Sequence, residues 1–108
     1  MAVEGKIRKA LKERVEAYGG EIRAVSWLGR RNAPDVLALF PFAGCFVVAG
    51  CFVVAGRLRS THPFIETKAP DGEPTAAQAR EHDRMRSAGC TVLVISTIAQ
   101  LDDWLPPV

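Results

Sequence analysis

The chain is poor in cysteine and in net charge, and these shortages exclude several classes of protein. Its three cysteines, Cys45, Cys51 and Cys90, are an odd number with no CxxC spacing. They therefore support neither a disulfide framework nor a zinc site, and we expect a reducing, cytoplasmic setting. The stretch from Glu4 to Glu16 is charged, which is unlike a secretory signal peptide.

The formal net charge is only +2, so the total charge alone does not indicate a nucleic-acid partner. Lysine and arginine nevertheless gather locally, near the start of the chain, around 30–31, at 57–59 and at 80–86. Such clusters can follow a phosphate backbone, and they can equally be ordinary solvated faces. With 48% hydrophobic residues and 108 positions, the composition predicts one globular domain over residues 1–108.

Residues 36–56 carry no charge over 21 positions, which is long enough on paper for a membrane helix. Pro41 would break such a helix, three glycines weaken it, and Phe and Val dominate the second half. The segment also contains a direct repeat, CFVVAG at 45–50 and again at 51–56. An even repeat keeps each side chain on one face of a strand, so we expect burial on both faces or a hairpin against a partner chain.

The order of elements predicts an α/β fold with a mixed central sheet flanked by helices. Helical spacing of apolar residues and glycine stops indicate helices, and β-branched runs indicate strands. The expected helices are 3–18, 75–88 and 97–105, and the expected strands are 21–28, 36–40, 62–68 and 91–96. Thr75 and Gln78 have the spacing of a capping box at the start of the second helix.

Three residues are placed as site residues would be. Asp35 follows Pro34 at the head of a strand, and Glu66 and Lys68 lie two apart on another, so they share a face. Carboxylates at Asp35 and Glu66 could supply hard oxygen ligands for Mg²⁺ or Mn²⁺, joined by the Thr67 carbonyl. Lys68 could then neutralise charge on a phosphate or orient a water. A plain Glu66–Lys68 pair at a sheet edge explains the same spacing.

The ordered set of motifs resembles the PD-(D/E)XK nucleases, which have a restriction-endonuclease-like core. More narrowly, it resembles the virus-type replication-repair nuclease domain, VRR-NUC. The resemblance spans nearly the whole chain. It runs through Glu4, Gly19-Gly20, Asn32-Ala33-Pro34-Asp35, the stretch 64–70 (FIETKAP), Pro74-Thr75 with Gln78, and Arg86-Ser87-Ala88-Gly89.

The resemblance implies a metal-dependent DNA endonuclease of phage or repair type. It also implies a homodimer that cuts branched DNA such as four-way (Holliday) junctions. Asp35 and Glu66 would hold the metal and Lys68 would be the catalytic lysine, while Glu4 and Gln78 would approach from the first two helices. Helix capping accounts for Gln78 as well as a site role does. An acidic residue near a helix N-terminus is favourable in any case, so Glu4 could be a catalytic residue or simply stabilise its helix.

Other polar and aromatic residues have structural interpretations. We expect His82 to line the packing face of its helix, and neither His62 nor His82 to be a metal ligand. Trp27 and Trp104 are expected in the core or at an interface.

Two features depart from the family pattern. Asn32 stands where glycine is usual, and the link between Asp35 and Glu66 is long and holds the CFVVAG duplication. The extra material would either enlarge a dimer contact or disturb the sheet. The alternative function is therefore a catalytically silent nuclease fold that binds DNA or a protein. The membrane interpretation would place Asp35 and Glu66 on opposite sides of a bilayer and would exclude a shared site.

Overall fold

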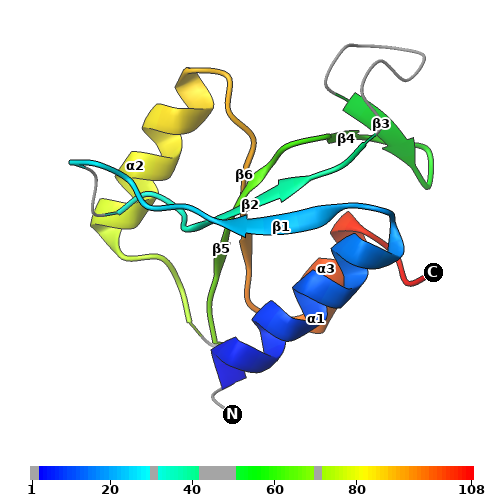
Figure 1. Cartoon of the computed structure of the whole chain (residues 1–108). Helices are drawn as coiled ribbons and strands as arrows, with labels where there is room; N and C mark the ends of the chain where they lie inside the picture. The colour runs from blue at the N-terminus through cyan, green and yellow to red at the C-terminus, as the bar shows by residue number, and fades with distance from the viewer. Residues whose placement is uncertain (1–2, 30–31, 42–50, 70–71) are drawn as a thin grey trace.

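The computed structural model describes residues 3–29, 32–41, 51–69 and 72–108, and it has three layers. A four-stranded sheet lies between a pair of helices, α1 and α3, on one face and α2 on the other (Figure 1). The elements in chain order are α1 (Val3–Ala17), β1 (Glu21–Ala24), β2 (Val36–Leu39), β3 (Cys51–Val54), β4 (Arg57–Ser60), β5 (Phe64–Thr67), α2 (Ala76–Ser87), β6 (Val92–Ile95) and α3 (Ile98–Trp104).

The sheet is mixed, as the sequence predicts. Its strand order is β1-β2-β5-β6, in which β1 and β5 pair antiparallel with β2, and β6 runs parallel to β5. The parallel step is possible because α2 carries the chain from the end of β5 back to the start of β6 (Figure 1). This crossover places α2 on the sheet face opposite α1.

The hydrophobic core lies between the sheet and the α1–α3 pair. The amphipathic stripe of α1 predicted from the sequence is buried, since Leu11 and Val15 have no exposed surface. Ile65 of β5 and Leu101 of α3 are equally buried and belong to the same cluster. The core therefore fixes β5, the inner strand that carries Glu66 and leads into Lys68, from its α1–α3 face.

Helix ends follow local chemistry that is visible in the sequence. Thr75 and Gln78 form the predicted capping box: the Thr75 hydroxyl accepts from the Gln78 N–H (3.1 Å), and the Gln78 side chain accepts from the Thr75 N–H (2.9 Å). Thr97 and Gln100 repeat this arrangement at α3. Gly89 follows α2 with φ +93°, a conformation that glycine adopts without strain.

The second CFVVAG copy forms a hairpin outside the main sheet. Its residues 51–54 are β3, which pairs with β4 through a turn at Ala55 and Gly56. Phe52 is buried against Phe40, with ring centroids 4.9 Å apart, while Val53 is 53% exposed. Burial on both faces, one of the two arrangements we expected, is therefore wrong for this copy. The first copy, 45–50, lies outside the described residues.

The hairpin is anchored to the end of α3 by arginines. Arg59 donates from Nε to the Trp104 carbonyl (2.9 Å) and from its guanidinium to the Asp103 carbonyl (3.1 Å). These bonds satisfy carbonyls that a helix C-terminus otherwise leaves without intrahelical partners. The basic cluster at 57–59 thus has a structural task. No helix within the described part of the chain is long and apolar enough to cross a membrane.

Candidate active site

The candidate site begins where the β2–β5 ladder ends. Phe40 donates its N–H to the Thr61 carbonyl (2.8 Å) and Ala38 donates to that of Pro63 (3.0 Å), and the last registered pair is Val36 with Ile65. Hydrogen-bonded pairs recur every second residue along this ladder, so the next pair would be Pro34 with Thr67. Proline has no N–H and cannot donate that hydrogen bond. Pairing stops there. One residue beyond the Val36–Ile65 pair stand Asp35, just before β2, and Glu66, within β5.

The backbone around Asp35 is fixed by two hydrogen bonds. Val25 donates its N–H to the Asp35 carbonyl (2.8 Å), and the indole Nε1 of Trp27 donates to the Pro34 carbonyl (2.6 Å). Trp27 itself packs on Phe64, with ring centroids 5.3 Å apart. The tryptophan expected to be a packing residue therefore also holds the Pro34-Asp35 turn in place.

Arg8 of α1 reaches the Asp35 carboxylate. One guanidinium nitrogen lies 3.2 and 3.3 Å from the two Asp35 oxygens and 3.4 Å from the Thr67 hydroxyl. The contact places the Asp35 carboxylate beside Thr67, on the α1 side of the sheet. Both partners are about half exposed (43% and 52%), so this ion pair contributes about 1 kcal/mol or less.

Glu66 lies on the opposite, α2-facing side of β5. It is only 9% exposed, and one of its carboxylate oxygens, Oε1, is 3.8 Å from Nε2 of His82, which is itself 1% exposed. Burial lowers the pKa of His82, and the positive charges of Arg86 and Lys68 lower it too, against opposing effects of Asp83 and Glu81. The imidazole is therefore neutral near pH 7. The sequence correctly predicted His82 as a packing residue, but it gave no sign of the contact with Glu66.

The remaining predicted site residues belong to three elements: the end of β5, α2 and α1. Lys68 shares the face of Glu66 at the end of β5, and Thr67 has no exposed surface. Gln78 is engaged in its capping box, one helical turn before His82, so capping explains its position and a role in catalysis stays a prediction. Glu4 belongs to α1, one turn before Arg8, but its side chain lies outside the described residues.

Two residues of this site, Arg8 and His82, were not predicted to belong to it. Each stands four positions after a candidate residue on the same helix, Arg8 after Glu4 and His82 after Gln78. Because residues four apart share a helix face, that spacing was the available signal.

The oxygen donors at the ends of β2 and β5 fit a hard divalent cation. Asp35 and Glu66 supply carboxylates and Thr67 a backbone carbonyl, and oxygen donors of this kind suit Mg²⁺ or Mn²⁺. The Arg8 guanidinium already sits on Asp35, which shows that this carboxylate is placed to hold positive charge. Among the described residues, no three acidic, histidine or cysteine side chains come together as a complete cluster. The two carboxylates approach the edge from opposite faces of the sheet.

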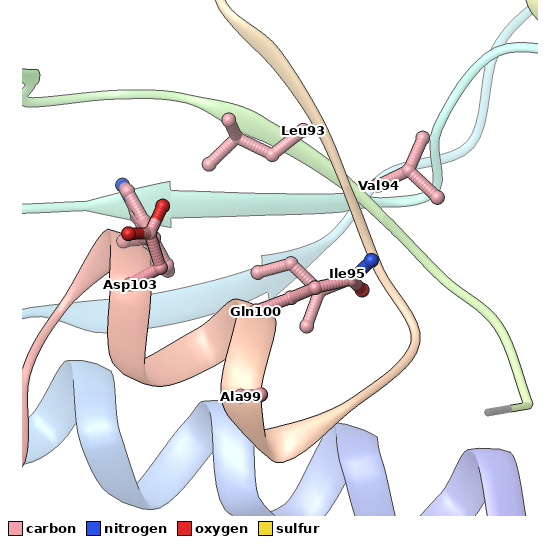
Figure 2. Close-up of a pocket in the computed structure, with 7 residues that line it drawn as sticks. Leu93, Val94, Ile95, Ala99, Gln100 and Asp103 are labelled. Carbon is pink, nitrogen blue, oxygen red and sulfur yellow. The ribbon is translucent and has the colours of Figure 1, made fainter.

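A separate pocket of about 430 Å³ lies between β6 and α3 (Figure 2). It is mostly apolar. Asp103 and Gln100 also line it, and the Gln100 side chain already accepts hydrogen bonds from the N–H and hydroxyl of Ser96. Its lining includes none of Asp35, Glu66 and Lys68. The candidate site at the ends of β2 and β5 is therefore separate from this pocket.

Comparisons with known proteins agree with this architecture. No family model matches the chain. A curated protein of Acyrthosiphon pisum secondary endosymbiont phage 1, named "Putative nuclease p44", is 32% identical over 105 residues, which cover 97% of this chain and 94% of that protein. A solved structure described as a VRR_NUC domain superposes with a TM-score of 0.73 at 34% identity, covering 95% of this chain and 94% of that one. The chain therefore belongs to the VRR-NUC family, in agreement with the motif order read from its sequence.

Proposed function

We propose that this protein hydrolyses phosphodiester bonds in DNA with the help of Mg²⁺ or Mn²⁺. The observation that carries the proposal is that Asp35 and Glu66 each stand one residue beyond the last registered pair of β2 and β5, with Lys68 two residues after Glu66. Membership of a nuclease family supports it.

Each residue of the candidate site has a defined task in the proposal. The Asp35 and Glu66 carboxylates and the Thr67 carbonyl hold the cation. When bound, a divalent ion supplies a water of lowered pKa and positive charge beside the scissile phosphate. The Lys68 ammonium neutralises the charge that develops on the phosphate as water attacks. Glu4 and Gln78 complete the site from α1 and α2.

Arginines of α1 and α2 offer contacts for the DNA backbone. Arg8 is drawn to phosphate once it leaves Asp35, and Arg80 and Arg84 lie exposed one turn apart on α2. We further propose that the substrate is branched DNA, in replication or repair within a bacterial or phage-infected cell. A homodimer would present two such sites about a two-fold axis and could cut two strands of a symmetric junction.

Metal removal is the first test of this proposal. The purified protein is incubated with a labelled four-way junction, a plain duplex or single-stranded DNA, each with Mg²⁺, Mn²⁺ or EDTA. We expect cleavage of the junction in both metals and none in EDTA, because the carboxylates alone cannot activate water. The products are followed on denaturing gels.

The same experiment distinguishes the alternative. Binding of DNA in a gel-shift assay without cleavage in any metal would contradict the nuclease and favour a binding module. Cleavage of duplex and junction at equal rates would contradict the preference for branched DNA and leave the nuclease standing.

A further inference from the structure

The histidine behind Glu66 is the most unusual polar group in the described part of the chain. His82 is 1% exposed, and among the described residues its Nε2 has no hydrogen-bond partner. A buried nitrogen without a partner is unfavourable, so a packing role alone gives no reason for histidine here. The capping box at the start of α2 and the core on the other sheet face are both complete without it.

The direction of the imidazole supplies the reason. Its Nε2 faces Oε1 of Glu66 at 3.8 Å, which is longer than the ~2.9 Å of a formed N–H···O hydrogen bond. Polar contacts in active sites are often long before the ligand binds and tighten in the complex. A small shift of either side chain closes this distance.

We infer that His82 is a positioning residue that donates an Nε2–H hydrogen bond to Oε1 of Glu66 and so fixes the orientation of this carboxylate. This inference rests on the proposed metal-dependent function. Carboxylates that hold metals are themselves oriented by hydrogen bonds, and loss of such a partner typically lowers metal affinity ~10–100-fold. His82 acts through Glu66 and touches neither DNA nor the cation.

The tautomer of the imidazole decides whether it can perform this task. A neutral imidazole carries one N–H, on either of its two ring nitrogens. In the Nε2–H tautomer that proton points at Glu66, and the bond does not neutralise the carboxylate. Glu66 then keeps the negative charge that a divalent cation needs.

Mn²⁺ affinity tests the inference without relying on activity. Binding is measured by titration calorimetry and by the electron paramagnetic resonance signal of free Mn²⁺, for the wild type and for His82→Leu, His82→Gln and Ser87→Ala. We expect His82→Leu to weaken Mn²⁺ binding ~10–100-fold. His82→Gln keeps an N–H donor of similar reach, so its Mn²⁺ affinity should return most of the way to that of the wild type. Ser87→Ala, an exposed change on the same helix, should bind as the wild type does.

Two results would overturn the inference. One is wild-type Mn²⁺ affinity in a folded His82→Leu variant, and the other is equal weakening in the leucine and glutamine variants, which would mean that the ring serves packing alone. Failure of the wild type itself to bind Mn²⁺ would instead overturn the proposed function, and this inference with it.

A second measurement needs no substitution at position 82. The chain has two histidines, so in a His62→Gln protein all imidazole nitrogen signals belong to His82. Nitrogen-15 NMR should show the Nε2–H tautomer with a slowly exchanging proton. The Nδ1–H tautomer would contradict the inference, because Nε2 would then have no proton to donate.

Discussion

Replacement of Glu66 by glutamine is expected to lower DNA cleavage by about a thousandfold or more while the protein stays folded. The change removes one negative charge from the proposed metal site but keeps the size of the side chain and an oxygen that can accept from His82. Cleavage rates under single-turnover conditions give the loss, and circular dichroism with thermal unfolding gives the fold. Asp35→Ala and Lys68→Ala are expected to abolish cleavage as well.

Glu73→Gln is the matched control for this prediction. Glu73 is exposed in the segment before α2, so the same loss of charge there should leave cleavage within about twofold of the wild type. Full activity in all three site variants would show that the site is elsewhere. Equal losses in Glu66→Gln and Glu73→Gln would mean that overall charge, and not this carboxylate, controls the rate.

The second large effect is on stability. Leu101→Ala is expected to cost about 2–5 kcal/mol of unfolding free energy, because Leu101 is fully buried between α1, α3 and the sheet and the deletion leaves a cavity. In a domain of this size the loss lowers Tm by more than about 10 °C. Urea and thermal unfolding measure it.

The control lies one turn earlier on the same helix. Ile98 is 46% exposed, so Ile98→Ala should change stability by about 0.5 kcal/mol or less. If Leu101→Ala unfolded at the wild-type temperature, α3 would not pack on α1 and the sheet as described. Because α3 carries no proposed site residue, Mn²⁺ affinity of the folded Leu101→Ala protein should remain that of the wild type.

Most elements could be predicted because their signals are local. The Thr75–Gln78 box and the glycine at 89 are defined by neighbours in sequence, and α2 has the expected ends. The β3–β4 hairpin was only one of two expected arrangements, and its second strand, β4, was not predicted because its turn lacks a strong local signal. Its turn places Ala55 and Gly56 at positive φ (51° and 77°), where Asn-Gly is the usual signal and alanine is uncommon.

The candidate site was predicted by motif order, and its surroundings were not. Proline at 34 marks the end of a ladder only once the register with Thr67 is known. The contacts of Arg8 with Asp35 and of His82 with Glu66 join residues 27 and 16 positions apart, and neither periodicity nor capping carries information over that distance. The prediction thus placed the carboxylates on their strands but could not show which side chains hold them.

The most direct test is crystallographic. Crystals of the wild type are soaked in Mn²⁺, and anomalous difference maps locate the ion. The account predicts a peak in contact with the carboxylates of Asp35 and Glu66 and the Thr67 carbonyl, with Arg8 displaced from Asp35, and no such peak in Glu66→Gln. Mn²⁺ bound elsewhere, or an Arg8–Asp35 pair that persists in saturating Mn²⁺, would contradict it.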